Sequence, residues 1–255
     1  MKLSPCIEWI FADAHDNLGD RVRAAKAAGY DHAEFHLWRD KDLAGLAQAL
    51  DETGVTLTGF CVDPRRSIVD PAQHAEFLDA VRDTIEQAKA LGSPPLIIAS
   101  GFVREGVSAE EHFSAAVTAL REAADLAEAA GVTMVLAPLN SRIDHPGMYL
   151  VETKLGLDLV EAVGSPRLKL LYDLYHSLVM GENPREVLEG RMHLVEHIQI
   201  ADLPGRNEPG TGGINWSSIL ADLRALGYDK TIGLEYRPTR PARESLALTE
   251  ETLGG

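Results

Sequence analysis

The segment Val132-Thr-Met-Val-Leu-Ala137 is a short apolar run, and Leu168-Lys-Leu-Leu-Tyr-Asp173 is a second one further along the chain. Between them, residues 153–163 read Thr-Lys-Leu-Gly-Leu-Asp-Leu-Val-Glu-Ala-Val, with apolar side chains at helical spacing, and Gly164 follows directly. A buried strand, an amphipathic helix ending at a glycine and a second buried strand are typical of a βα unit with parallel strands. This stretch therefore predicts a fold of alternating strands and helices.

The same alternation continues over the whole chain. Strands are predicted at residues 3–11, 31–36, 55–61, 95–100, 132–137, 168–173, 195–200 and 231–235. Helices are predicted at residues 17–28, 41–53, 71–91, 109–130, 153–163, 183–189, 216–226 and from 240 onward. Because no linker or low-complexity tract interrupts this pattern, it favours a single (β/α)8 TIM barrel domain over residues 1–255.

The main alternative is an open sheet that binds a dinucleotide, which needs a glycine-rich turn after its first strand. The residues there, Ala12-Asp-Ala-His-Asp16, contain no glycine. Asp70 and Ser108 are predicted to cap the helices that follow them. Glycines follow six predicted helices, where a left-handed residue commonly ends a helix: Gly29, Gly54, Gly92, Gly131, Gly164 and Gly227.

Composition narrows the class of partner. The chain has 255 residues, 45% of them hydrophobic, and its formal net charge of −15 comes from 39 acidic and 24 basic residues. This balance disfavours a nucleic-acid partner. Cys6 and Cys61 lie among apolar residues and are predicted to be buried free thiols. The apolar N-terminal stretch is interrupted by Glu8 and Asp13, so we expect a cytoplasmic protein without a membrane partner.

Polar residues gather at predicted strand ends, which is where (β/α)8 barrels carry their catalytic groups. Carboxylates from several strands would repel one another at one mouth unless a cation lay between them. We expect Asp173, Glu235 and the Gln199 carbonyl to bind one divalent metal ion, and oxygen ligands favour Mg²⁺ or Mn²⁺ over zinc. The strand-end segments are Glu34-Phe-His36, Asp173-Leu-Tyr-His176, His197-Ile-Gln199 and Glu235-Tyr-Arg237.

Several of these side chains also have a plainer interpretation. Glu34 is expected either to bind substrate or to anchor the next loop. His36 and His145 are expected either to transfer protons or to form part of the wall. His176, three residues after Asp173, is expected to bind substrate or to donate a hydrogen bond to a carbonyl.

The strand-end motifs also carry a family resemblance. They are Pro138-Leu-Asn140, the Leu-Tyr-Asp-Leu-Tyr-His run to His176, residues 197–212, Ile214-Asn-Trp216 and Gly233-Leu-Glu-Tyr-Arg-Pro238. At these residues the sequence resembles the hydroxypyruvate isomerase family, within the xylose isomerase-like barrels that also include ketose 3-epimerases, inosose dehydratases and endonuclease IV. The resemblance covers essentially the whole chain. Its most specific part, Pro204-Gly-Arg-Asn-Glu-Pro209, favours the isomerase branch over the endonuclease, which needs more histidine ligands.

The resemblance implies a metal site with one residue missing. Family members bind the metal through a glutamate, an aspartate, a glutamine or histidine, and a glutamate at strands five to eight. The last three correspond to Asp173, Gln199 and Glu235, but the family motif Glu-Pro-Leu-Asn reads Ala137-Pro-Leu-Asn140 here. The two glutamates of the family also act as its acid/base pair. Gly213 is a second departure, because the family usually has glutamate there.

Two explanations of Ala137 remain open. One is a deliberate inactivating substitution, which the intact surrounding motifs favour, and the other is a natural paralogue that lost metal-dependent chemistry and only binds a sugar or sugar acid. Loss of a positioned acid or base costs about 10²- to 10⁴-fold in rate. We therefore expect this chain to be nearly inactive.

The expected parent reaction is metal-assisted proton transfer between adjacent carbons of a hydroxy-carbonyl substrate through an enediolate, as from hydroxypyruvate to tartronate semialdehyde. Arg206 is expected to bind a substrate carboxylate, or else to pair with Glu208. The expected substrate-binding set is His176, Arg206, Glu34, His36 and Glu208. A ketose 3-epimerase remains the alternative enzyme, and the resemblance implies a homodimer or homotetramer.

Overall fold

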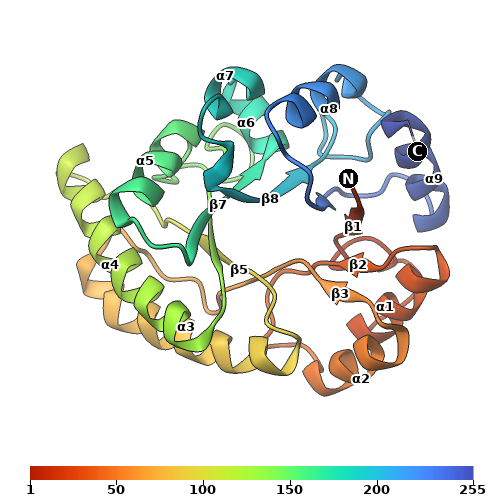
Figure 1. Cartoon of the computed structure of the whole chain (residues 1–255), viewed down its shortest axis with the longest axis horizontal. Coiled ribbons are helices and arrows are strands. Elements are labelled where there is room, and N and C mark those ends of the chain that lie inside the picture. The colour runs from red at the N-terminus through yellow and green to blue at the C-terminus, as the bar shows by residue number, and fades with distance from the viewer. Residues whose placement is uncertain (255) are drawn as a thin grey trace.

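The computed structural model describes residues 1–254, and strands alternate with helices along all of them (Figure 1). The strands are β1 (Leu3–Pro5), β2 (His32–Ala33), β3 (Thr56–Leu57), β4 (Phe60–Cys61), β5 (Leu96–Ala99), β6 (Met134–Ala137), β7 (Leu168–Asp173), β8 (Val195–Ile200) and β9 (Ile232–Leu234). The α-helices are α1 (Leu18–Ala27), α2 (Leu43–Thr53), α3 (His74–Ala90), α4 (Ala109–Ala130), α5 (Thr153–Val163), α6 (Leu174–Met180), α7 (Pro184–Leu188), α8 (Trp216–Ala225) and α9 (Ala242–Leu253). Short 3₁₀ turns, η1 (Pro71–Gln73) and η2 (Met192–Leu194), precede α3 and β8.

The strands form a curled parallel sheet inside a ring of helices (Figure 1). Seven strands follow the order β1-β9-β8-β7-β6-β5-β4, and β2 pairs with β3. A parallel bridge between Cys6 and Glu34 joins the β1 edge to the β2 edge. The Cys61 amide donates to the His36 carbonyl at 2.9 Å, which joins β4 to the β2 side. These links close the sheet and confirm the predicted TIM barrel.

Several predicted strands are shorter or broken, and β2 covers only two of the six residues predicted at 31–36. The strand predicted at 55–61 is interrupted between β3 and β4, where Gly59 lies close to the neighbouring strand, because a Cβ there would be 3.5 Å from Ile97. The strand predicted at 3–11 ends at Pro5, and the Trp9 and Ile10 amides donate back to the Cys6 carbonyl in a turn. Ile7 and Ile10 are buried in that turn. A short apolar run alone does not distinguish a buried turn from a buried strand.

The helix α6 was not predicted, and its start explains why. Asp173 is the last residue of β7 and also the N-cap of α6, where its side chain accepts a hydrogen bond from the Tyr175 amide at 2.9 Å. A strand thus passes into a helix without a loop. The helix ends at Gly181 after only two turns, which is too short a segment for a clear helical pattern.

The predicted helix ends are confirmed. All six glycines named above have positive φ, between +68° at Gly54 and +99° at Gly29. Asp70 accepts from the Ala72 amide, and Ser108 forms a reciprocal capping box with Glu111. Cys6 and Cys61 are buried free thiols as predicted. Within residues 1–254, no helix is long and apolar enough to cross a membrane.

Candidate active site

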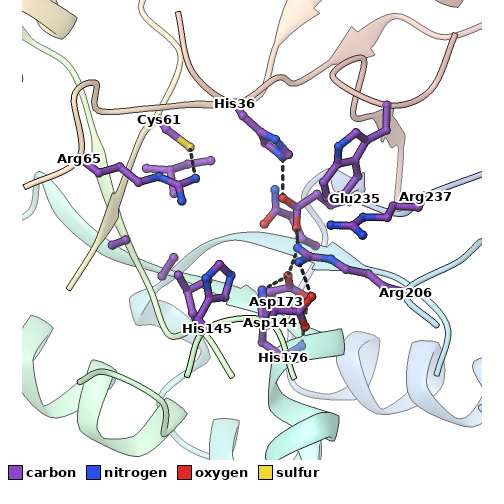
Figure 2. Close-up of a pocket in the computed structure, with 16 residues that line it drawn as sticks. His36, Cys61, Arg65, Asp144, His145, Asp173, His176, Arg206, Glu235 and Arg237 are labelled. Atoms are coloured by element: carbon purple, nitrogen blue, oxygen red, sulfur yellow. Dashed lines mark hydrogen bonds and ion pairs between the residues drawn. The ribbon is translucent and has the colours of Figure 1, made fainter. Parts of the chain in front are cut away.

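A cavity of about 240 Å³ opens at the C-terminal ends of the strands (Figure 2). Its polar lining comes from strand ends and from the loops that follow them, and it includes seven of the polar candidates from the sequence. It is lined by Trp9, His36, Cys61, Arg65, Ile97, Ala99, Ala137, Leu139, Asp144, His145, Asp173, His176, Gln199, Arg206, Glu235 and Arg237. These polar residues therefore lie at the C-terminal ends of the strands, where (β/α)8 barrels carry their catalytic groups.

Arg206 lies at the centre of the charged residues. Its Nη2 donates a hydrogen bond to Glu235 Oε2 and lies 3.5 Å from Asp173 Oδ2, while Nη1 lies 3.6 Å from Asp144 Oδ1. The guanidinium also lies over the Trp9 ring, 5.2 Å from its centroid. Arg206 is buried and has a left-handed backbone with φ +56°. One permanent cation thus faces three carboxylates.

The pKa values of Asp173 and Glu235 are shifted in opposite directions. Burial, followed by the charge of Glu235, raises the pKa of Asp173 well above its usual range. Burial acts in the same direction on Glu235, but Arg206 and the hydrogen bond from His36 outweigh it and lower the pKa of Glu235 well below its usual range. The His36 Nε2 to Glu235 Oε1 distance is 2.7 Å. Of these two carboxylates, Glu235 is therefore the one that stays ionised.

His176 has a defined tautomer. Its Nδ1 lies 3.1 Å from the Asn140 amide nitrogen and 2.6 Å from Asn140 Nδ2. Because a backbone N–H only donates, Nδ1 must accept, and the proton of the neutral ring is on Nε2. Burial and the charge of Arg206 lower the pKa of His176 to about 3, which keeps the ring neutral. Nε2 makes no hydrogen bond within residues 1–254 and lies 3.4 Å from Asp173 Oδ2, so its N–H is available to an oxygen bound beside that carboxylate.

The residues fit an oxygen-ligated divalent cation. Ligand atoms of Asp173, His176 and Glu235 all lie within 4.8 Å of one another. His176 Nε2 carries a proton in this tautomer and therefore has no lone pair for a cation. The carboxylates of Asp173 and Glu235 are thus the better ligands. Gln199 adds a third oxygen, because its Nε2 donates to Glu34 Oε1 at 2.7 Å and Oε1 is left for a cation.

Ala137 forms part of an apolar wall of the same cavity. It is the last residue of β6 and is buried next to Ile97 and Leu139, in a small cluster that also contains Val135 and Leu171. Glu235 reaches the cavity from the end of β9, with β7 and β8 between the two strands in the sheet. The wall formed by β6 therefore offers no acid, base or ligand at residue 137.

Glu34 lies within the barrel and does not line the cavity. It is only 1% exposed, and its two oxygens accept from Gln199 Nε2 at 2.7 Å and His197 Nε2 at 2.6 Å. Gly233 makes room for it, because a Cβ at that residue would lie 2.5 Å from Glu34 Oε2. Glu34 thus fixes the amide of Gln199 from behind.

Glu208 also lies outside the cavity, and it does not pair with Arg206. It is fully buried and accepts from the Thr239 amide at 3.0 Å, from Thr239 Oγ1 at 2.7 Å and from Arg240 Nε at 3.0 Å. These bonds tie the segment after β8 to the segment after β9. Glu208 therefore supports the loop that carries Arg206.

Some lining residues had no signal in the sequence. Asp144 accepts from Asn140 Nδ2 at 2.7 Å and from the Tyr175 hydroxyl at 2.9 Å, and it lies in the loop after β6. Arg65 lies in the loop after β4, on the other side of the cavity from Arg237 (Figure 2). Loop residues follow no strand or helix period, so only the three-dimensional structure brings them to the site.

The closed parallel barrel thus carries a strand-end pocket lined by carboxylates, imidazoles and guanidinium groups. A family model described as xylose isomerase-like TIM barrel matches residues 22–252. The chain belongs to this family.

Curated relatives and solved structures match along most of the chain. A 2-oxo-tetronate isomerase of Cupriavidus necator is 30% identical over 92% of this chain and 93% of its own length. A hydroxypyruvate isomerase of Escherichia coli is also 30% identical, over 93% and 94% of the two chains. The crystal structure of an AP endonuclease, family 2, from Brucella melitensis superposes with a TM-score of 0.89 at 28% identity, covering 96% of each chain. The two curated relatives support an isomerase.

Proposed function

We propose that this chain binds a short hydroxy-carbonyl acid in the strand-end cavity, in the manner of a metal-dependent hydroxypyruvate isomerase. The observation that carries the proposal is Glu235, an ionised carboxylate in the cavity held between His36 and Arg206. The names of the two isomerase relatives support the substrate class, because 2-oxo-tetronate and hydroxypyruvate are both hydroxy-carbonyl acids.

The side chains divide the work of binding such a substrate. Asp173, Gln199 and Glu235 would hold a Mn²⁺ or Mg²⁺ ion, which when bound polarises the carbonyl and its neighbouring hydroxyl. Arg206 Nε is buried and has no hydrogen-bond partner among the described residues, so it is available to a substrate carboxylate. His176 Nε2–H donates to a substrate oxygen, and Glu235 accepts or returns the proton on carbon.

Ala137 limits what this chain does with that substrate. Proton transfer between adjacent carbons uses one group to remove a proton and one to deliver it, and we place Glu235 in the first role. The second role belongs to residue 137, where alanine has no titratable group. The chain is therefore an inactivated form of the isomerase, with a rate lower by about 10²- to 10⁴-fold than its glutamate counterpart.

A binding protein without turnover is the second candidate, and the uncharged residues at 137 and 213 favour it. The two candidates use the same cavity. They differ only in whether Ala137→Glu would restore isomerase activity. Both candidates predict that hydroxypyruvate binds to the chain as it stands.

Calorimetric titration of hydroxypyruvate tests this shared prediction. We expect saturable binding that tightens when Mn²⁺ is present and weakens by about tenfold or more in Arg206→Gln, since a charged hydrogen bond is lost. Arg121→Gln is the matched control, because Arg121 is exposed and donates only to the Ala162 carbonyl. Equal affinity of the two variants would contradict the proposed role of Arg206.

A further inference from the structure

A second groove of about 310 Å³ adjoins the strand-end cavity. It shares Arg65, Ala99 and His145 with that cavity and extends over the loops that follow β4 and β5. In Figure 2, Arg65 lies on the opposite side of the cavity from Glu235. A ligand that reaches from Glu235 past Arg65 therefore enters this groove.

The groove is positively charged in a chain whose net charge is −15. Arg65, Arg66 and Arg104 line it, and among the described residues Asp70 is the one carboxylate in its lining. Asp70 lies 3.5 Å from Arg104 Nε and is also engaged as a helix cap. Three guanidinium groups against one carboxylate leave an excess of positive charge.

Arg65 carries the part of this charge that is not neutralised. No carboxylate within residues 1–254 forms an ion pair with it, and its one side-chain hydrogen bond is a 4.0 Å contact from Nη2 to Cys61 Sγ. Burial raises the pKa of Cys61 to about 11, so this sulfur is a neutral thiol and not a counter-ion. By contrast, Arg66 pairs with Glu76 at 2.6 Å.

Ser67 supplies a buried polar group in the same groove. It is 8% exposed, and its Oγ has no hydrogen-bond partner among the residues that the structure describes. Gly101 keeps the space beside this hydroxyl open, because a Cβ there would lie 2.4 Å from Ser67 Oγ. A buried hydroxyl without a partner is costly unless a ligand satisfies it.

We propose that this groove binds an oxyanion at the far end of the substrate, a phosphate or a carboxylate several carbons from the carbonyl that faces Glu235. The inference rests on the proposed function and extends it from short acids to longer ketose phosphates or keto sugar acids. Arg65 and Arg104 contact the oxyanion, and Ser67 Oγ donates a hydrogen bond to it. Guanidinium groups bind phosphate and carboxylate oxygens through paired N–H donors.

Two matched pairs of ligands test the groove by calorimetry. D-ribulose 5-phosphate is compared with D-ribulose, and 5-keto-D-gluconate is compared with L-sorbose, so that each pair differs only in the distal anion. We expect at least one anionic ligand to bind about tenfold more tightly than its neutral match. A preference in the first pair alone identifies phosphate, and a preference in the second pair alone identifies carboxylate.

Variants locate the preference. We expect Arg104→Gln and Ser67→Ala each to remove most of it while the affinity for the neutral ketose is unchanged. Arg82→Gln is the control for lost surface charge, because Arg82 is exposed and pairs with Asp79 on α3. Equal affinities within both pairs would overturn the inference, and so would a preference that survives in both groove variants.

The outcome separates this inference from the proposed function. If hydroxypyruvate binds and neither pair shows a preference, the inference of an oxyanion site is wrong and the proposed function stands. If hydroxypyruvate does not bind, the proposed function fails, and inorganic phosphate is then titrated directly. Its affinity must fall in Arg104→Gln and in Ser67→Ala, or the groove fails as well.

Discussion

Arg206 donates a hydrogen bond to Glu235 from inside the cavity, so its guanidinium holds a carboxylate that the proposed metal site also requires. The same guanidinium lies 3.5 Å from Asp173 Oδ2. A divalent cation on Asp173 and Glu235 would share these oxygens with Arg206. The charge of Arg206 therefore stabilises the ionised carboxylate of Glu235 when no cation is bound.

Replacement of Arg206 by methionine should destabilise the metal-free protein. Removal of one partner from a buried ion pair leaves uncompensated charge and costs about 3–5 kcal/mol in unfolding free energy. We expect Mn²⁺ to recover part of this loss and to stabilise Arg206→Met more than the unmodified chain. Urea unfolding with and without Mn²⁺ measures both effects, with Arg121→Met as the surface control. Equal stabilisation by Mn²⁺ in the two proteins would remove Asp173 and Glu235 from the cation site.

Gly233→Ala tests the buried support of Gln199. The added Cβ would lie 2.5 Å from Glu34 Oε2, against a carboxylate that also holds His197. Overpacking of this kind costs roughly 1–3 kcal/mol. Gly213→Ala is the matched control, because a Cβ there meets nothing within 4 Å, and it should stay within about 0.5 kcal/mol. Thermal unfolding compares the two variants, and similar stabilities would mean that Glu34 is not tightly confined.

His32 should make the protein sensitive to acid. Neither of its ring nitrogens has a partner among the described residues, and burial, followed by the charge of Lys2, lowers the pKa of His32. The unfolded chain binds a proton near the ordinary value of about 6.5, whereas the folded chain does so only at lower pH. The contribution of His32 to the free energy of unfolding is therefore fully present above about pH 6.5, and it decreases as the pH falls below that value.

His32→Leu should remove this acid sensitivity. The variant no longer buries an unsatisfied ring, so we expect a gain of about 1 kcal/mol that grows as the pH falls from 7 to 5. Urea unfolding at several pH values measures the gain, and His193→Leu is the control because His193 is exposed. A gain that does not change with pH would show that His32 titrates normally in the folded chain.

The sequence was sufficient for the barrel because βα units repeat. Leu168–Asp173 and Val195–Ile200 are strands over the ranges that their apolar runs predict, and the glycines after the helices adopt the predicted left-handed conformation. Two of the exceptions are the turn after Pro5, in which Ile7, Ile10 and Phe11 are buried, and α6, which begins directly after the last residue of a strand. Both depend on tertiary packing, which outweighs local pattern.

The site was predictable where it lies on strands and not where it lies on loops. Asp173, Gln199, Glu235 and His176 reach one cavity, as the strand-end rule predicts. Glu34 and Glu208 are glutamates like Glu235, but hydrogen-bond partners enclose their side chains outside that cavity. Arg65 and Asp144 come from loops of irregular conformation, and the sequence around them contains no spacing that links them to Glu235.

The assay that tests the account most directly measures isomerisation by this chain and by Ala137→Glu. Hydroxypyruvate and short ketoses are the substrates, Mn²⁺ or Mg²⁺ is added, and product analysis separates a moved carbonyl from an inverted carbon. We predict that Ala137→Glu isomerises hydroxypyruvate about 10²- to 10⁴-fold faster than the unmodified chain, because the second proton-transfer group returns. If Ala137→Glu binds hydroxypyruvate and Mn²⁺ but forms no product, the isomerase account is contradicted and the chain is a binding protein.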